Sequence, residues 1–231
     1  MSPRTPAEAR DWAALGTRLF LAAADSFGPA EYAAPTALPG WSRAHLAAHL
    51  AANADALGNL VHWAATGEPT PMYASPEERL AGIERGRALP AAELTARVRE
   101  SAERLAAGLD ALTPEQWQAP VVTAQGRTVP AAELPWLRAR EACVHAVDLA
   151  AGPAFADLPA GFLAALCEDV LAKRAAAPGP ALTLRTPDDS ARWYLPGEGE
   201  SVLVTAELPL VTAYLTGRQQ IEGAPPLGPW L

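Results

Sequence analysis

The segment 138–149 carries side chains that can bind a metal ion. Glu141 and His145 are four residues apart, and in a helix this spacing places both on one face, one turn apart. Carboxylate and imidazole groups are common zinc ligands, and a catalytic zinc site typically has three protein ligands and one open position. This segment is therefore a candidate for two ligands, and the third would come from elsewhere in the chain.

The chain has only four histidines, so few side chains can complete such a site. His45 and His49 share one face of another predicted helix, and His62 lies three turns further along. The spacing leaves the choice among them open. It also leaves an alternative, in which Glu141 pairs with Arg138 or another base and each histidine is hydrogen-bonded at a packed surface.

The elements that would position these residues are amphipathic helices. Apolar residues recur at helical spacing, and prolines and glycines fall between the periodic segments. Ser42 is a predicted N-cap, and the start of a helix at Ser75-Pro76-Glu77-Glu78 is strongly signalled. Predicted helices cover residues 6–26, 42–65, 76–112 with a break near 90, and 130–151. Four such helices favour a bundle whose interior can hold a site built from facing helices.

The pattern changes after Gly152-Pro153. Short runs rich in β-forming residues follow one more predicted helix, and turn residues separate them. The expected elements are a helix at 159–176, strands at 181–184, 191–195 and 201–205, a turn at 196–199, and a closing helix at 208–216. The expected fold is therefore α+β, with a helical bundle domain at 1–152 and a smaller α/β domain at 153–231.

Composition narrows the class of protein. The formal charge of −8, from 18 basic and 26 acidic residues, opposes general binding to nucleic acid or to anionic membranes. No segment has the roughly 20 apolar residues of a membrane span, and residues 1–10 lack the apolar core of a signal peptide. We therefore expect a cytoplasmic protein. Cys143 and Cys167 lie in apolar helical patterns and are expected to be small buried hydrophobes.

Several sequence motifs resemble those of a known protein family. The run Leu38-Pro39-Gly40-Trp41-Ser42-Arg43-Ala44-His45-Leu46-Ala47-Ala48-His49, followed by Asn53, closely resembles the helix-opening motif of the mycothiol-dependent maleylpyruvate isomerase family. The bundle of that family is similar to the DinB-like metal-binding fold. Further matches are His62-Trp63-Ala64, Thr66-Gly67-Glu68, Thr70-Pro71-Met72-Tyr73, residues 123–130, Arg140-Glu141 and 145–149. They cover the first 150 residues densely and the remainder more thinly.

The resemblance implies a set of site residues. The zinc ligands would be His49, Glu141 and His145, with the fourth position open, and His45 would be a neighbouring or packing residue. The functional arginines of the family correspond here to Arg79 and, with a weaker local match, Arg218.

The resemblance also implies an activity. Maleylpyruvate would be isomerised from cis to trans, giving fumarylpyruvate in gentisate breakdown, with mycothiol as the thiol cofactor. A thiolate that adds to the activated double bond leaves a single bond that can rotate before the thiolate departs. Zinc would lower the pKa of the thiol or polarise the substrate carbonyl, and the two arginines suit a dicarboxylate substrate.

Two other functions, and the role of Asp148, remain open in the sequence. On the same scaffold, a mycothiol S-transferase would join the thiol permanently to an electrophile, and a non-catalytic protein would bind a small ligand.

Asp148 could orient a ligand imidazole or could be a solvated or capping residue near the helix end. Cys143 lies about 200° around the helix from Glu141 and His145 and is not expected to be a metal ligand or the attacking thiol.

Overall fold

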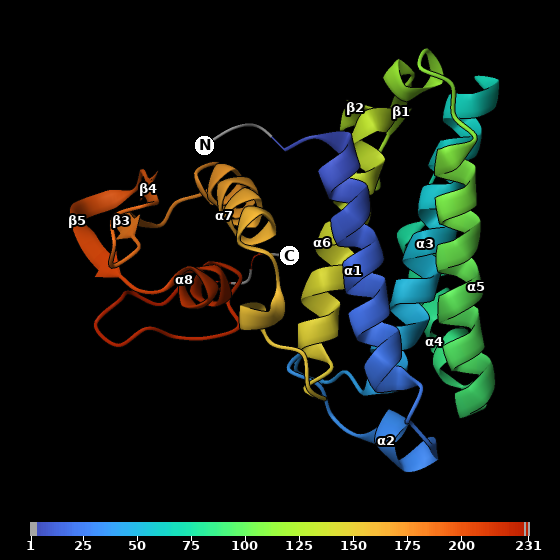
Figure 1. The fold of residues 1–231 in the computed structure, drawn as a ribbon, viewed down its shortest axis with the longest axis horizontal. Coiled ribbons are helices and arrows are strands. Elements are labelled where there is room, and N and C mark those ends of the chain that lie inside the picture. The colour runs from blue at the N-terminus through green and yellow to red at the C-terminus, as the bar shows by residue number, and fades with distance from the viewer. Residues whose placement is uncertain (1–3, 229, 231) are drawn as a thin grey trace. The chain divides into compact units, whose positions relative to one another are not determined.

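The computed structural model describes residues 4–228 and 230. The chain divides into two compact units, one formed by Thr5–Pro153 and the other by Arg4 together with the chain from Ala154 on. The first unit is helical with one small hairpin, and the second combines helices with a three-stranded sheet (Figure 1). The overall class is α+β, as the sequence predicts. The predicted domain boundary between residues 152 and 153 stays a prediction.

The first unit is built around four long helices that pack side by side (Figure 1). Their bounds, with those of the two shorter helices, are α1 Pro6–Ala24, α2 Pro29–Ala33, α3 Arg43–Thr66, α4 Pro76–Arg87, α5 Ala91–Asp110 and α6 Leu134–Asp148. The expected break near residue 90 separates α4 from α5. The short helix α2 is absent from the sequence prediction, because five residues are too few to show a helical period. The predicted helix at 130–151 is shorter than expected and is preceded by a 3-10 turn at Ala131–Glu133.

The helix ends follow local capping chemistry. Thr5 and Glu8 form a capping box at the start of α1, and the Ser75 hydroxyl accepts from the backbone N–H of Glu78 at 3.1 Å. Gly67 ends α3 in the left-handed conformation, with φ 78°, where a side chain would be strained. These caps set where α3 ends and α4 begins, and hence the loop between them.

One close helix contact in the first unit joins α1 to α6. A Cβ atom on Gly16 would lie 2.5 Å from the backbone nitrogen of Cys143, so only glycine lets the two backbones approach this closely. Trp12 and Trp136 pack edge to face nearby, with ring centroids 6.0 Å apart. This contact holds α6, the helix that carries Glu141 and His145, against the bundle.

A small hairpin closes one end of the first unit. Strands β1 Pro120–Val122 and β2 Thr128–Pro130 pair antiparallel, and Gly126 makes the turn with φ 75°. From the sequence, residues 121–128 are predicted to form a single extended segment around Gln125-Gly126. The hairpin forms because Val121 and Val129 face each other and are buried against the bundle core.

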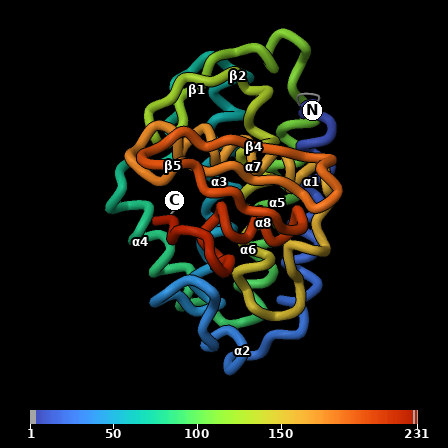
Figure 2. Tube along the Cα trace, turned by 90° about the vertical axis from the view of Figure 1, so that its left-hand side faces the viewer, coloured from blue at the N-terminus to red at the C-terminus, as the bar shows by residue number. Residues whose placement is uncertain are grey.

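The second unit contains helices η3 Phe155–Asp157, α7 Ala160–Arg174 and α8 Leu208–Leu215, and strands β3 Pro180–Arg185, β4 Arg192–Leu195 and β5 Glu198–Thr205. The strand order is β4-β3-β5, with β3 antiparallel to β4 and parallel to β5. Figure 2 labels the two outer strands, β4 and β5, on the orange part of the chain. The predicted turn at 196–199 is too long, because β5 begins at Glu198. Gly197 crosses directly beside the backbone of Gly179 and Pro180, where a Cβ would clash.

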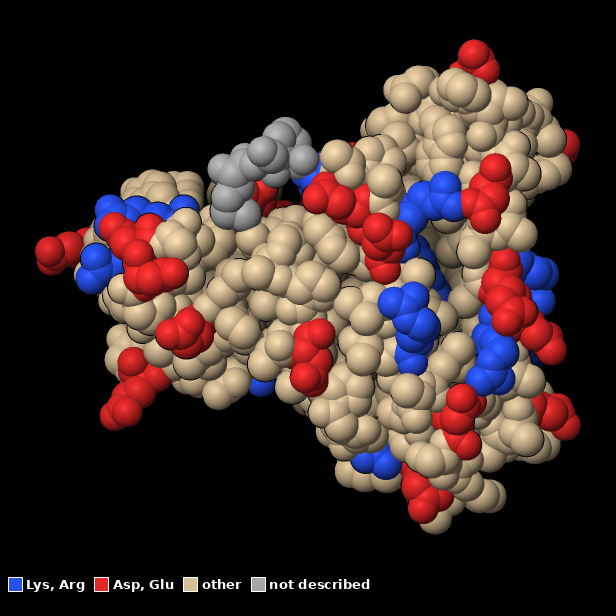
Figure 3. Space-filling model, in the orientation of Figure 1, with Lys and Arg blue, Asp and Glu red and all other residues tan. Residues whose placement is uncertain are grey.

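The surface mixes charges of both signs. On the face shown in Figure 3, acidic and basic side chains are interspersed over the helices. Asp55, for example, pairs with both Arg97 and Arg104 at 3.2 and 2.9 Å. Among the described residues, no helix combines the length and apolar character needed to cross a bilayer.

Candidate metal centre

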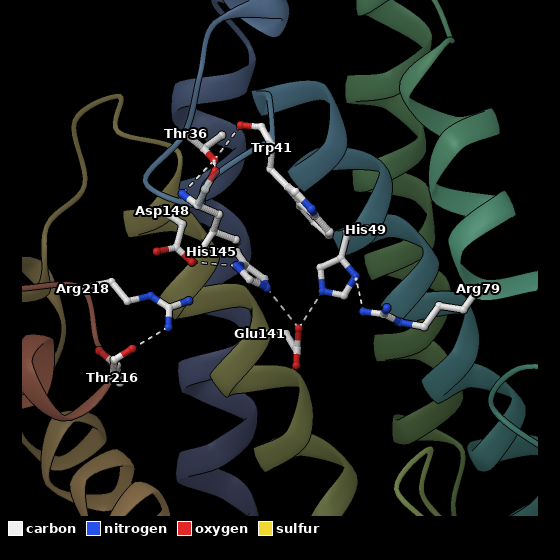
Figure 4. A network of polar contacts seen from close by, with 10 residues as sticks. Thr36, Trp41, His49, Arg79, Glu141, His145, Asp148, Thr216 and Arg218 are labelled. Atoms are coloured by element: carbon white, nitrogen blue, oxygen red, sulfur yellow. Dashed lines mark hydrogen bonds and ion pairs between the residues drawn. The ribbon is translucent and has the colours of Figure 1, made fainter. Parts of the chain in front are cut away.

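Helices α3 and α6 bring three ligand-type side chains together inside the first unit. Nε2 of His49 lies 2.9 Å from Oε2 of Glu141, and Nε2 of His145 lies 3.3 Å from the same oxygen. The two imidazole rings are 5.0 Å apart between centroids and nearly perpendicular. In Figure 4 the rings converge on the carboxylate from two sides. One potential ligand atom from each residue therefore lies within 4.8 Å of the others.

His145 is oriented by a buried carboxylate. Its Nδ1 donates to Oδ2 of Asp148 at 2.9 Å, and Asp148 is fully buried. A second-sphere carboxylate on one imidazole nitrogen fixes the tautomer and leaves the other nitrogen for a metal. Of the two roles that the sequence leaves open for Asp148, the structure shows the orienting one and excludes a solvated side chain.

The pKa values of the three side chains are shifted in different directions. Burial would raise the pKa of Glu141, but hydrogen bonds from His145 and His49 outweigh it and hold the pKa well below its usual range. Burial would lower the pKa of His145, but hydrogen bonds to Asp148 and Glu141 raise it to about 9. Burial lowers the pKa of His49 despite its bond to Glu141. At neutral pH the metal-free cluster thus holds an ionised Glu141, a charged His145 and a neutral His49.

The other two histidines point elsewhere. Nδ1 of His45 accepts from the backbone N–H of Ser42 at 3.1 Å, and its Nε2 lies 3.5 Å from Glu84. His45 therefore completes the N-terminal cap of α3. His62 is exposed, and its nearest carboxylate is Glu68 at 4.0 Å. Of the four histidines, the fold directs only His49 and His145 to Glu141.

Arg138 does not form the pair with Glu141 that the sequence leaves open as an alternative. Its Nη1 donates to the backbone oxygen of Leu50 at 2.7 Å and to Oδ1 of Asn53 at 2.9 Å. Arg138 is buried, and burial lowers its pKa to about 10. Its Nη2 has no hydrogen-bond partner among the described residues. This guanidinium therefore adds positive charge to the interior one turn from Glu141.

Arg79 and Trp41 complete the surroundings of His49. Nη2 of Arg79 lies 3.5 Å from Nδ1 of His49 (Figure 4). The indole of Trp41 packs edge to face on the same imidazole, with centroids 5.6 Å apart. Arg79 thus lies beside the candidate metal cluster formed by His49, Glu141 and His145, although its spacing in the sequence shows no relation to His49. The sequence assigns no role to Trp41, because its contact with His49 arises only from packing.

Arg218 belongs to the second unit. Its Nη1 donates to the backbone oxygen of Thr216 at 2.7 Å, and its guanidinium carbon lies 5.9 Å from the ring centroid of Trp230. It also lines a hollow of about 160 Å³ with Tyr214, Gly217, Gln219, Gln220 and Leu227. A catalytic role for Arg218 stays a prediction.

Both cysteines are buried, as expected. Sγ of Cys143 donates to the backbone oxygen of Trp12 at 3.3 Å, and that of Cys167 lies 3.3 Å from Oγ1 of Thr212. Burial raises the pKa of each thiol to about 12. Because a thiolate is the reactive form, neither cysteine suits the role of attacking nucleophile.

The chemistry of the cluster fits a divalent metal ion. Two imidazoles and one carboxylate are the donor set of a three-ligand catalytic zinc site. Asp148 supplies the partner that a ligand imidazole requires on its second nitrogen. The burial of His49 favours the neutral form, which is the one that coordinates metal.

The first unit corresponds to a known protein family. The family model described as the mycothiol maleylpyruvate isomerase N-terminal domain matches residues 2–150. The chain belongs to this family. A comparison with curated proteins found no match.

Solved structures extend this relationship to both units. A crystal structure of a mycothiol-dependent maleylpyruvate isomerase is 37% identical, with a TM-score of 0.89, over 95% of this chain and 93% of its own. A histidine-to-alanine mutant of a mycothiol-dependent maleylpyruvate isomerase gives 36% identity with the same TM-score and coverage. YfiT from Bacillus subtilis, titled a probable metal-dependent hydrolase with an unusual four-helix bundle topology, is 16% identical, with a TM-score of 0.52, over 65% of this chain and 91% of its own. That last likeness concerns the fold alone.

Proposed function

We propose that this chain catalyses the mycothiol-dependent cis–trans isomerisation of maleylpyruvate to fumarylpyruvate. The observation that carries the proposal is the similarity to mycothiol-dependent maleylpyruvate isomerase across 95% of the chain, which includes the second unit as well as the bundle. The cluster of His49, Glu141 and His145 supports it, because a buried His/Glu/His set needs a function beyond packing. Gentisate breakdown is the proposed pathway and zinc the proposed metal.

The residues of the site have separable tasks in this reaction. His49, Glu141 and His145 would hold the metal, and Asp148 would keep the imidazole of His145 in its metal-binding tautomer. A bound zinc ion would supply a Lewis acid that favours a thiolate over a thiol. The thiol would supply reversible addition, which turns the substrate double bond into a single bond that can rotate. Arg79 lies beside His49, with a planar guanidinium suited to a carboxylate group.

Neither cysteine of the chain can replace the external thiol. Each is buried and has its pKa raised to about 12 by desolvation, so each is protonated at neutral pH. The proposed reaction therefore depends on an added low-molecular-weight thiol. Arg218 is the proposed second arginine for the dicarboxylate substrate.

The test is an assay of maleylpyruvate loss and fumarylpyruvate formation by purified protein. Four conditions are compared, with and without mycothiol and with and without a metal chelator. As a rescue control, the chelator is then removed and zinc is added back. We expect isomerisation only with thiol and metal together. Stoichiometric consumption of mycothiol would indicate an S-transferase, and no rate above the uncatalysed one would indicate a binding protein. Either result would refute the proposed function.

A further inference from the structure

The loop between α3 and α4 holds Tyr73 in a defined place. The side-chain amide of Asn59 donates to the backbone oxygen of Pro71 at 3.2 Å. Sδ of Met72 accepts from the backbone N–H of Ala124 in the hairpin turn at 3.2 Å. Ser75 then caps α4. Tyr73 therefore lies between two anchored points of the loop.

Arg79 lies between Tyr73 and the metal cluster. Its guanidinium carbon is 5.8 Å from the ring centroid of Tyr73, within the range of a cation–π contact. Its Nη2 is 3.5 Å from Nδ1 of His49 on the other side. The ring of Tyr73 thus limits where the guanidinium of Arg79 can go, and that guanidinium borders His49.

Positive charge exceeds negative charge around the phenol of Tyr73. Burial raises its pKa, and the charge of Arg79 and its hydrogen bond lower it, with smaller effects from Glu141 and Arg138. No carboxylate lies within ion-pair distance of Arg79 among the described residues. Arg138 is buried further away, and its effect on the pKa of Tyr73 is smaller than that of Glu141. The half-buried hydroxyl of Tyr73 and the guanidinium of Arg79 beside it together favour an anion.

We propose that Tyr73 is a substrate-binding residue, whose hydroxyl donates a hydrogen bond to the same substrate carboxylate that Arg79 binds. The proposal rests on the proposed function and extends it, because it assigns one end of the dicarboxylate to a tyrosine–arginine pair. Arg79 provides charge and two N–H donors, and Tyr73 provides orientation and a third donor. A monocarboxylate or neutral alkene that lacks this end would lose both contacts.

The test measures equilibrium binding without turnover. Maleylpyruvate is titrated calorimetrically into the zinc-loaded full-length protein in buffer free of any thiol. The variants are Tyr73→Phe, Arg79→Ala and the double variant, and the control is Tyr194→Phe, which changes an exposed tyrosine of β4. The Phe side chain keeps the ring and removes one oxygen atom, so the fold should be retained, and thermal unfolding checks this. Metal content is measured for each variant.

We expect Tyr73→Phe to weaken maleylpyruvate binding roughly tenfold or more, the range for a hydrogen bond to a charged group. The loss should be much smaller in the Arg79→Ala background, because both residues bind one carboxylate and their effects are coupled. The Tyr194→Phe control should bind like wild type. Wild-type affinity in Tyr73→Phe, an equal loss with and without Arg79, or no binding by wild type would each overturn the inference. Isomerisation is measured separately, so an inactive wild-type protein that binds with this pattern refutes the proposed function alone.

Discussion

At the scale of single residues, neighbouring histidines on α3 have different tasks. His49 points to Glu141 at 2.9 Å, whereas His45, one turn earlier, accepts from the backbone of Ser42. Both are histidines on one helix face, yet only His49 reaches α6. The difference arises because α3 crosses α6 near His49, while the first turn of α3 has unpaired N–H groups that a side chain must satisfy.

This difference makes a matched pair of variants informative. We expect His49→Ala to lose stoichiometric zinc, because one of the three proposed ligands is removed. His45→Ala should retain zinc and lose only the stability of a helix cap, about 1 kcal/mol. Elemental analysis after dialysis measures the metal, and urea unfolding measures the stability. Zinc retained by His49→Ala, or lost by His45→Ala, would show that the ligand set is wrong.

The raised pKa of His145 predicts that the folding stability of the metal-free protein depends on pH. Its folded pKa of about 9 lies above the ordinary value of 6.5. The folded state therefore binds more protons than the unfolded state between these pH values. This stabilisation is complete below pH 6.5 and is lost as the pH rises through about 9, by an amount on the order of 1 to 3 kcal/mol.

The pKa shifts of one carboxyl group, Glu141, and one imidazole, His49, affect stability in acid. The lowered pKa of Glu141 gives stabilisation above its ordinary value of 4.5 that is lost as the pH falls, and the lowered pKa of His49 also disfavours the folded state in acid. Urea unfolding of chelator-treated protein from pH 4 to 9.5 measures the combined curve. We expect His145→Gln to lack the decline between pH 6.5 and 9. An identical decline in that variant would assign it to other groups.

At the scale of elements, the site depends on how closely α6 packs against its neighbours. α6 carries two of the three cluster residues, and Gly16 of α1 lies directly against its backbone. A methyl group there cannot be accommodated by rotating a side chain, because two of the nearest atoms are main-chain atoms of Ala142 and Cys143. The position of α6 therefore depends on a residue that is remote from the metal cluster.

Two glycine variants test this dependence. Gly16→Ala should destabilise the protein by roughly 1 to 3 kcal/mol or more through overpacking, and should weaken zinc binding by displacing α6. Gly58→Ala on α3 has nothing within 4 Å of the new Cβ and should be neutral or stabilising by up to about 1 kcal/mol. Chemical denaturation and a competitive zinc titration measure the two effects. Equal stability of the variants would contradict the packing argument.

At the scale of the whole molecule, the proposed functional residues are divided between two units. The metal cluster and Arg79 lie within Thr5–Pro153, whereas Arg218 lies in the unit from Ala154 on. The matched isomerase structures cover both. Metal binding and substrate turnover should therefore depend on different parts of the chain.

A truncated protein ending at Pro153 tests this division. We expect it to bind zinc, because each cluster residue and Asp148 lie within it, and to lack isomerase activity, because Arg218 is removed. The full-length Arg218→Ala protein is the control, and should keep zinc while losing turnover. Zinc stoichiometry, circular dichroism and the isomerase assay are the measurements. Wild-type turnover by the truncated protein would exclude a role for the second unit.

The sequence alone determines the local structure and the candidate ligands of this protein. Helical periodicity and caps predict α1, α3 and α5 to within a few residues, because those signals act within one turn of the chain. The four-residue spacing of Glu141 and His145 likewise places them on one face before any packing is known. The family motifs then nominate His49 as their partner. The missed elements, such as α2 and the early start of β5, are short segments whose form depends on contacts.

Only the tertiary structure decides which of these side chains meet. It directs His49 rather than His45 to Glu141, buries Asp148 against His145, and places the guanidinium of Arg79 near both Tyr73 and His49. No residue spacing in the sequence predicts the contacts between different elements, because each of them joins two helices or a helix and a loop. They follow from how closely helices such as α1 and α6 can approach, which depends on atoms far apart in the chain.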